Sequence, residues 1–370
     1  MSAYSKPDFI TSGDEFSLAY FSTSSNFLLV QGDLEVFFCD ALNPNFECYN
    51  EVIEKLIIDH PEMIQCFVGY KEAGICPQKI TNMASKQGLL TGQLSTAIQL
   101  SRSFVKVHFE SVSLKQIFLA PYEHLIIERP DLKDFNILSF YQNKGHICMV
   151  SKSNEIAYAL EFEYHKLQAQ FANTLIEYYH NLESNPWLCS FHACAVQKNN
   201  KTYLILGDSG AGKSTLTALM CGSGYRFVGD DLILMDSEFN IYDNPAALSV
   251  KENSWNIVSK YHERFSTINE SNRTKGKTKM KYLPLHLIQN NTPKKHKISA
   301  LIWVNYKSNV KTQLKPLSSF DICSKLIPDT WVNPDSNYPE LFAHWLIQTK
   351  GYQLTYSDYS SLESILNVGF

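Results

Sequence analysis

The hydrophobic pattern divides the chain into a strand-rich first part and a second part in which strands and helices alternate. In residues 1–75, apolar or alternating runs such as FSLAYF and NFLLVQGDLEVFFCD stand between Ser, Asn, Gly and Pro, which predicts strands joined by turns. A helix is predicted near 88–104, and the apolar spacing of 167–182 is typical of a second helix. Further strand-like runs lie at 117–128, 146–152 and 155–167.

From Trp187 onward the pattern predicts strands around a glycine-rich loop. LCSFHACAV is a predicted strand, QKNNK a polar turn, and TYLILG a second strand that runs into the loop. STLTALMCGSG predicts a helix that ends at Gly222 or Gly224, because glycine tolerates the left-handed conformation that closes helices. YRFVGDDLILMD predicts another strand, interrupted at Gly229–Asp231.

The last third of the chain is predicted to alternate between exposed loops and buried strands. The polar, basic segments 266–281 and 290–297 are predicted to be exposed loops, and ISALIWVNY, at 298–306, a final buried strand. The tail from Tyr352 predicts a strand followed by a short helix. We therefore predict a strand-rich α+β N-terminal domain over 1–150 and an α/β domain over 151–370, although no Pro/Gly-rich linker marks the boundary.

Composition restricts the class of protein more than its function. The chain has 370 residues, of which 44% are hydrophobic and 19% charged, and a formal net charge of -4, which argues against general nucleic-acid binding. Its nine cysteines form no C-x-x-C pair, which indicates reduced thiols in a cytosol-like compartment. No signal-peptide pattern is present, and no apolar run approaches the roughly 18 residues that span a bilayer. We expect a cytoplasmic protein without a membrane partner.

The glycine-rich loop predicts a site for a polyphosphate. Its sequence, GDSGAGKST, satisfies G-x-x-x-x-G-K-S/T between a predicted strand and a predicted helix. The glycines allow backbone N–H groups to converge on an anion, and the helix N-terminus adds partial positive charge. The lysine can reach the β- and γ-phosphates, and the serine hydroxyl can bind Mg²⁺. The expected binding residues are Gly207, Asp208, Ser209, Gly210, Ala211, Gly212, Lys213, Ser214 and Thr215.

An acidic pair and a histidine are the candidates for chemistry beside this loop. Phosphoryl transfer to a hydroxyl needs a group that accepts or positions the proton. Asp230 and Asp231 interrupt the strand after the loop helix. If that strand returns alongside the first one, its end lies near the phosphates, and one carboxylate can face the site while the other contacts metal or backbone. A hairpin through QKNNK would bring His192 beside the loop, although such a histidine can equally be a core residue.

Together, the His192 strand, the loop GDSGAGKST and the run YRFVGDDLIL resemble the HPr kinase/phosphorylase family and its HPr-kinase-related members, over about residues 187–370. The resemblance implies a P-loop kinase fold of the HPr kinase/phosphoenolpyruvate carboxykinase type, which phosphorylates serine with ATP and Mg²⁺. It implies that Asp230 is the catalytic base, that Asp231 supports the metal with Ser214, that Lys213 holds the β/γ-phosphates and that His192 stabilises charge at the transferring group.

One departure from the family pattern narrows the expected substrate. The bifunctional enzymes of the family carry a Glu-Ile-Arg-Gly-Leu-Gly type segment after the acidic pair, whereas the counterpart here is Ser249-Val250-Lys251. The missing acid and glycines argue against phosphorylase activity and against HPr as the substrate. The Ser-x-Lys version resembles the HPr-kinase-related group, some of whose members phosphorylate serine on precursor peptides. We therefore expect a protein or peptide partner with an acceptor serine.

The sequence leaves other interpretations open. The chain can be a nucleotide-dependent switch or ATPase without an acceptor, or a kinase of a small hydroxyl-containing metabolite. The N-terminal domain matches no family that indicates a role, and we expect it to serve recognition or homo-oligomerisation. A basic run is either a solvated loop or a loop that closes over the triphosphate; its residues are Arg273, Lys275, Lys277, Lys279 and Lys281.

Overall fold

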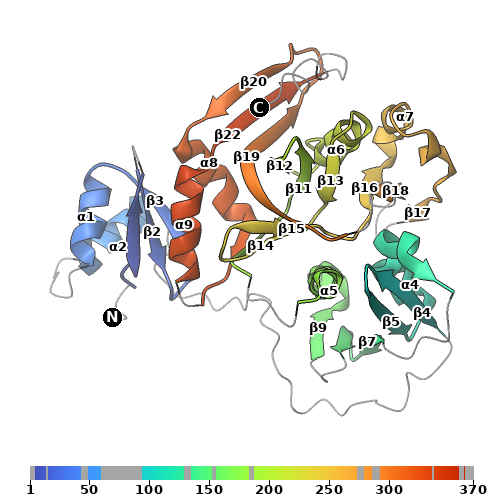
Figure 1. Ribbon diagram of the computed structural model, residues 1–370. Coiled ribbons are helices and arrows are strands. Elements are labelled where there is room, and N and C mark those ends of the chain that lie inside the picture. Colours follow the sequence, from blue (N-terminus) through green and yellow to red (C-terminus); the bar gives the residue numbers. More distant parts are fainter. Residues whose placement is uncertain are drawn as a thin grey trace.

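The computed structural model is a mixed α/β chain with several sheets, arranged as three units along the sequence (Figure 1). The first unit in sequence is at the left in Figure 1 and lies against helix α9 of the large C-terminal unit. The second unit in sequence, called the middle unit below, lies under the C-terminal unit at the right of the figure. The described residues are 5–13, 16–42, 49–59, 94–128, 135–151, 156–182, 187–272, 279–285, 292–335, 337–357 and 362.

The first unit is a three-stranded antiparallel sheet covered by two helices. The predicted strand through 26–40 is wrong in its second half. The strand ends before Gly32, which has a φ of 56°, and a helix follows in which Leu34, Phe38 and Ala41 share one face toward the strands. The elements are β1 (Phe9–Ser12), β2 (Ser17–Phe21), β3 (Asn26–Val30), α1 (Asp33–Ala41) and α2 (Tyr49–Asp59).

The middle unit is a six-stranded sheet with the strand order β6-β4-β5-β7-β8-β9, packed against α4 and α5. Phe118, Phe140 and Phe171 meet at its centre, with ring centroids 4.2 to 6.0 Å apart. The elements are β4 (Ser95–Leu100), β5 (Ser103–Phe109), α4 (Val112–Leu119), η2 (Ala120–Leu125), β6 (Ile126–Ile127), β7 (Asn136–Asn143), β8 (His146–Ser151), β9 (Ile156–Leu160), η3 (Glu161–Glu163) and α5 (Tyr164–His180).

For the middle unit, two predictions are wrong, one is wrong in its second half and two are confirmed. The predicted strand at 146–152 is confirmed as β8, whereas the predicted strand at 155–167 ends at Leu160 and is followed by η3 and α5. The described part of the predicted helix near 88–104 is strand, because burial alternates along β4 and the chain reverses at Ser101, which has a φ of 53°. The predicted strand at 117–128 is mostly helix. The Ser111 side chain caps the N-terminus of α4, and α4 buries Leu114 and Phe118, which lie one turn apart on the same face. The predicted helix at 167–182 is confirmed as α5. The sheet continues across residue 150, and the division into 1–150 and 151–370 stays a prediction.

The C-terminal unit contains a ten-stranded mixed sheet and a small three-stranded sheet, β16-β18-β17. At the centre of the large sheet, β12 and β22 both pair in parallel with the long strand β19. Ile205, Ile302 and Leu354 on these strands are fully buried against α6. Parallel strands covered by helices carry such apolar runs, which is why this part of the pattern was clearest in the sequence.

The elements of this unit follow one another in short steps. They are β10 (Cys189–Phe191), β11 (Cys194–Lys198), β12 (Lys201–Leu206), α6 (Lys213–Gly222), β13 (Arg226–Gly229), β14 (Ile233–Met235), β15 (Asn240–Tyr242), β16 (Leu248–Lys251), η4 (Glu252–Ser254), α7 (Trp255–Val258), η5 (Glu263–Thr267), β17 (Ser271–Asn272), β18 (Lys279–Leu283), β19 (Lys295–Tyr306), β20 (Gln313–Leu317), α8 (Ser319–Leu326), η7 (Ile327–Asp329), β21 (Thr330–Val332), α9 (Tyr338–Gln348) and β22 (Gly351–Tyr356).

The predicted exposed loops of the last third are in part strands. Lys281 lies in β18, is only 9% exposed, and places its ammonium over the rings of Trp255 and Phe265. His296 is buried at the start of β19, which includes the predicted strand 298–306 but is not the final strand. Arg273, Lys275 and Lys277, and the predicted helix at the end of the tail apart from Leu362, lie outside the described residues.

The units are joined by specific contacts. Phe27 of β3 meets Phe342 of α9, with ring centroids 5.9 Å apart. Ala246 of the C-terminal unit is buried in the core of the middle unit, and the N–H of Ala247 donates to the Pro121 carbonyl at 2.8 Å.

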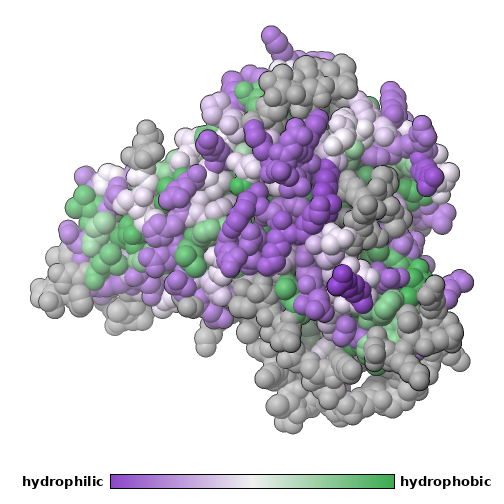
Figure 2. Space-filling model, viewed as in Figure 1, coloured by the Kyte–Doolittle hydropathy of each residue, from purple (hydrophilic) through white to green (hydrophobic). Residues whose placement is uncertain are grey.

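Among the described residues, no helix is long and apolar enough to cross a membrane. On the two helices of the first unit, Val36 and Ile58 are 63% and 77% exposed. Figure 2 shows hydrophobic atoms gathered on the surface of this unit.

Candidate active site

The glycine-rich loop joins β12 to α6, as the sequence predicts. Its backbone is left-handed at Gly210 and Gly212, with φ values of 86° and 96°. Gly212 precedes the first turn of α6, whose side chains from Thr215 to Met220 are buried. The loop therefore ends at a helix N-terminus whose first N–H groups have no partner within the helix, the arrangement that favours anions.

At the start of α6, the side chains of Lys213 and Ser214 form hydrogen bonds with different parts of the site. The Lys213 Nζ donates to the carbonyl of Gly207 at 2.6 Å and lies 3.5 Å from the carbonyl of Asp208. The ammonium is therefore held over the loop itself. The Ser214 Oγ donates to the Asp230 Oδ1 at 3.3 Å. This contact links the loop to the acidic pair.

The strand order explains how the acidic pair reaches the loop. The expectation that the second strand lies beside the first is wrong, because β11 lies between β12 and β13. Since β11 is antiparallel to both, β12 and β13 run in the same direction and end at the same edge of the sheet. Residues 230–232, which connect the end of β13 to the start of β14 at Ile233, therefore still lie next to the loop.

Asp230 is buried, and both of its carboxylate oxygens accept hydrogen bonds. Oδ1 accepts from the Cys194 Sγ at 2.8 Å and from the Ser214 Oγ at 3.3 Å. Oδ2 accepts from Ser249 twice, from its N–H at 2.9 Å and its hydroxyl at 2.7 Å. Burial, followed by the negative charge of Asp230, holds the pKa of the Cys194 thiol well above its ordinary value, so the thiol remains a donor. A carboxylate offers about four lone-pair positions, and Asp230 uses that many within the protein.

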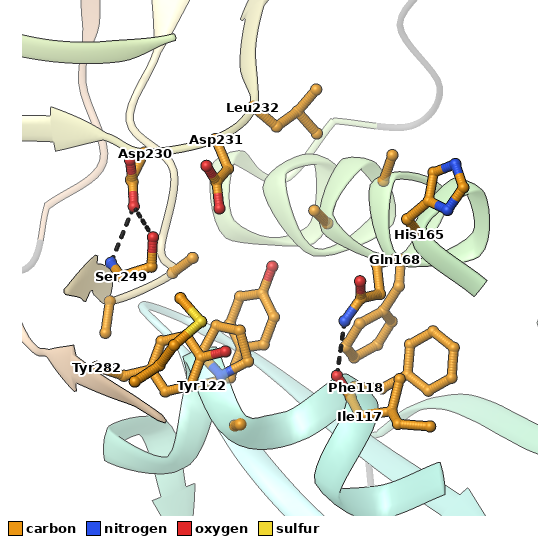
Figure 3. Close-up of a pocket in the computed structure, with 18 of the residues that line it drawn as sticks. Ile117, Phe118, Tyr122, His165, Gln168, Asp230, Asp231, Leu232, Ser249 and Tyr282 are labelled. Atoms are coloured by element: carbon orange, nitrogen blue, oxygen red, sulfur yellow. Dashed lines mark hydrogen bonds between the residues drawn. The ribbon is translucent and has the colours of Figure 1, made fainter. Parts of the chain in front are cut away.

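Asp231 has the opposite environment. It is exposed and has a φ of 63°, and Figure 3 shows its carboxylate pointing toward a cavity, whereas Asp230 is hydrogen-bonded to Ser249. Its carbonyl oxygen lies 3.2 Å from the Nδ1 of His192. The turn between the two aspartates and Leu232 is supported by the Asn244 amide, which donates to the carbonyls of Asp230 and Leu232 at 3.3 and 3.0 Å.

His192 is not within a strand. The predicted strand 188–196 is divided into β10 and β11, and His192 lies at the break between them. The two halves pair with different neighbours, β10 with β14 and β21, and β11 with β12 and β13. The predicted hairpin between β11 and β12 is present and turns at Asn199 and Asn200, and the His192 side chain is exposed beside Asp231.

His192, Asp230 and Asp231 meet at one cavity of 390 Å³ between the middle and C-terminal units. The loop residues 207–215 are not among the residues that line it, and Asp230, which is bonded to Ser214, connects the loop to the cavity wall. Its other walls come from α4, η2, α5 and the small sheet (Figure 3). The lining also includes Gln116, Ile117, Phe118, Ala120, Pro121, Tyr122, Tyr164, His165, Gln168, Ala169, Phe171, Ala172, Leu232, Asn244, Ala246, Ala247, Ser249, Ser271, Met280 and Tyr282.

Several residues of the site were not found from the sequence. In the sequence, Ser249 was noted only because it stands where the bifunctional enzymes of the family carry an acid. In the structure it donates two of the hydrogen bonds to Asp230. Cys194 follows His192 by two residues, but its pairing with an aspartate far along the chain has no local signal. Asn244 and Tyr122 likewise carried no motif that could have singled them out.

No protein-family model matches the sequence, and no curated protein has a significantly similar sequence. Solved structures that are similar include the Hpr(Ser) kinase/phosphatase from Coxiella burnetii, with 10% identity and a TM-score of 0.24. The match covers 48% of this chain and 94% of that chain. At this identity and TM-score, the likeness assigns no role to any residue, so residue roles depend on the geometry of the site.

A pair of glycine substitutions tests the loop. A Cβ on Gly212 would lie 2.9 Å from the Tyr356 hydroxyl, whereas a Cβ on Gly210 would meet nothing within 4 Å. Both residues have positive φ, so each alanine costs about 1 kcal/mol of backbone strain. Gly212→Ala should in addition displace the start of α6 and weaken binding of ATP by about tenfold or more relative to Gly210→Ala. Titration with a fluorescent ATP analogue measures this; equal affinities would contradict the expected displacement.

Proposed function

We propose that the protein is an ATP-dependent kinase that transfers the γ-phosphoryl group to a serine hydroxyl of a protein or precursor peptide. The observation that carries the proposal is the position of the acidic pair. Asp230 is hydrogen-bonded to Ser214 of the glycine-rich loop, and the next residue, Asp231, faces a cavity. One pair of adjacent carboxylates thus separates a loop suited to the donor phosphates from a space suited to an acceptor.

The residues beside Asp230 fit a magnesium ion. A hydroxyl and a carboxylate oxygen 3.3 Å apart, next to an anion-binding loop, are oxygen ligands of the kind that Mg²⁺ takes together with phosphate oxygens. Bound there with ATP, Mg²⁺ would neutralise negative charge on the phosphates. Ser214 and Asp230 would hold it in place of the hydrogen bond between them, while Asp230 keeps its bonds to Cys194 and Ser249. Lys213, already turned over the loop, would shift its ammonium from the Gly207 carbonyl to the β/γ-phosphates.

The hydrogen bonds lead us to propose a division of roles opposite to the one expected from the sequence. The sequence assigned the base to Asp230 and metal support to Asp231. Asp230, however, is buried and accepts four hydrogen bonds, so its oxygens are held toward the protein. Asp231 is exposed and directed at the cavity. We therefore assign Asp231 to accept the proton of the acceptor hydroxyl, and Asp230 to support the metal.

His192 is assigned to the transferring group. Its ring is exposed at the same cavity and its Nδ1 lies 3.2 Å from the Asp231 carbonyl, which fixes one edge of the imidazole. Because Nδ1–H donates to that carbonyl, the other nitrogen is an acceptor in the neutral ring. When the ring carries both protons, that nitrogen would donate toward oxygen atoms that gain charge during transfer. A serine-bearing partner, a homo-oligomeric state and a cytoplasmic location are proposed with this function, in accordance with the expectations from the sequence.

Labelling with γ-³²P-ATP tests the proposal against its alternatives. The purified full chain is incubated with labelled ATP, Mg²⁺ and a cell lysate, and the macromolecular and small labelled products are separated. The kinase proposal expects an acid-stable label on a protein or peptide, with serine as the labelled residue. ADP release that does not depend on an acceptor, with no labelled product, would indicate a switch or ATPase instead, and a labelled small molecule would indicate a metabolite kinase.

A further inference from the structure

We propose that the cavity between α4, α5 and the acidic pair is an acceptor pocket for an uncharged, largely apolar group attached to the hydroxyl that is phosphorylated. The inference rests on the proposed kinase function and extends it by naming the chemistry of the acceptor. That chemistry can come from an aromatic or aliphatic side chain beside a serine in an extended peptide, or from the apolar body of a free alcohol.

The walls of the cavity are mainly apolar and come from two units. Phe118, Tyr122 and Phe171 of the middle unit are buried in its core and present ring atoms to the space. Met280 and Tyr282 of β18 also line it, and Tyr282 lies beside Tyr122 (Figure 3). A wall of rings and a thioether gains free energy by covering apolar surface and can adapt to its shape.

The charges on the cavity disfavour an anion. Among the described residues that line it, none is lysine or arginine, and the formal negative charges are those of Asp230 and Asp231. Burial, together with the negative charge of Asp231, raises the pKa of Tyr122, so its phenol stays neutral. A carboxylate or phosphate placed here would lie near Asp231 with no lysine or arginine among these residues to compensate it, and with His165 and His192 as the ionisable bases.

Several polar groups on the wall are already committed within the protein. The Gln168 amide donates to the Ile117 carbonyl at 2.8 Å, Asn244 donates to two carbonyls, and both donors of Ser249 go to Asp230. These bonds hold α4 against α5 and the acidic turn against β16. The pocket therefore selects by shape and apolar contact, and the carboxylate of Asp231 fixes the position of the hydroxyl.

The size of the cavity limits the occupant. At 390 Å³ it falls in the range of small-molecule pockets, about 300 to 1,000 Å³. It is large enough for an aromatic ring with its linking atoms and too small for a folded domain. A protein acceptor would thus have to present its serine on an extended segment, with the neighbouring apolar side chain inserted between α4 and α5.

Binding of two matched probes to the full chain tests the inference without relying on turnover. 2-Naphthalenemethanol carries a neutral hydroxyl on an aromatic body, and 2-naphthoate has the same body with a negative charge. Saturation-transfer NMR and calorimetry should show the alcohol binding about tenfold or more tightly than the carboxylate, because of the aspartate charges. Absence of binding by the alcohol, or equal binding of the two probes, would overturn the proposal.

A pocket-filling variant locates the binding. Ala169 lines the cavity from α5 and is partly buried, so Ala169→Phe should reduce affinity for the alcohol by about tenfold or more. Val36→Phe adds a similar ring on exposed α1 and should change nothing. Affinity for Mg·ATP should be unaltered in both variants, since Ala169 is not part of the loop. If the wild type bound the alcohol selectively but failed to bind Mg·ATP, the kinase proposal would fall and the pocket would stand.

Competition distinguishes the two sources of the apolar group. A five-residue peptide with phenylalanine on both sides of one serine is compared with a peptide that has aspartate at those positions. Displacement of the alcohol by the phenylalanine peptide assigns the pocket to a peptide acceptor, and its failure, with the alcohol still bound, assigns the pocket to a free alcohol. Equal displacement by the aspartate peptide contradicts an apolar, uncharged occupant.

Discussion

Asp231→Asn is expected to reduce phosphoryl transfer by about 100- to 10,000-fold, the range that general acid–base groups contribute, while the affinity for Mg·ATP stays near that of the wild type. The amide has nearly the same shape but cannot accept the proton of the acceptor hydroxyl. Asp231 is exposed, and asparagine tolerates its φ of 63°, so the fold should be unaffected. Transfer from γ-³²P-ATP to the lysate acceptor, beside equilibrium binding of the nucleotide, measures both quantities.

Two further variants show which carboxylate is the base. Asp59→Asn, on the exposed end of α2 in the first unit, should leave transfer unchanged. Asp230→Asn should act differently, because its amide would direct N–H groups at the donors of Cys194 or Ser249. We expect it to lower stability to urea and the Mg²⁺ dependence of nucleotide binding together. If Asp231→Asn transferred normally while Asp230→Asn bound Mg·ATP normally and transferred nothing, the role expected from the sequence would be correct.

Periodicity identified the C-terminal core more reliably than the first two units. β12, β13 and the 298–306 part of β19 are continuous apolar runs with a helix between them, a pattern with few competing interpretations. DLEVFFCDA and IFLAPYEHL are as apolar as strands and became helices, because Gly32 ends β3 and the Ser111 side chain caps α4. Short apolar runs have no period of their own, so such single residues decide between the two structures.

Some features of the site were visible as local sequence motifs, whereas others depend on contacts between residues far apart in the chain. The loop, the acidic pair and His192 are sequence motifs, and the structure brings the acidic pair near both of the others. The position of β11 between β12 and β13 could not be predicted, because pairing depends on contacts far apart in the chain. The same holds for the bonds from Cys194 and Ser249 to Asp230, which span 36 and 19 residues. These bonds hold Asp230 toward the protein, whereas Asp231 is exposed at the cavity.

The cavity depends on the middle unit as much as on the loop-bearing one. Ala246 enters the core of the middle unit, and Ala247 donates to the Pro121 carbonyl between η2 and the start of β16. These contacts place Tyr122 at the end of the small sheet that carries Ser249. Asp230, held by Ser249, and the apolar wall are thus fixed by one connected set of contacts.

Lys213→Ala is expected to lower phosphoryl transfer by about 100- to 1,000-fold and also to weaken nucleotide binding, which separates it from Asp231→Asn. The ammonium lies 2.6 Å from the Gly207 carbonyl, within the loop that would surround the phosphates. Its loss removes positive charge both from the bound nucleotide and from the transferring group. Binding of Mg·ATP and of Mg·ADP should be compared by calorimetry, and the loss should be larger for ATP because the γ-phosphate is the further point of contact.

The control for this variant is Lys260→Ala, which removes an exposed lysine that follows α7. It should change neither binding nor transfer, so a general effect of net charge would be recognised by equal losses in both variants. Since the Lys213 side chain also bonds to the loop carbonyls, thermal unfolding without nucleotide is measured in parallel. An alanine variant that unfolds like the wild type, binds ATP as tightly as the wild type and transfers phosphate at the same rate would contradict the assignment of residues 207–215 as the donor site.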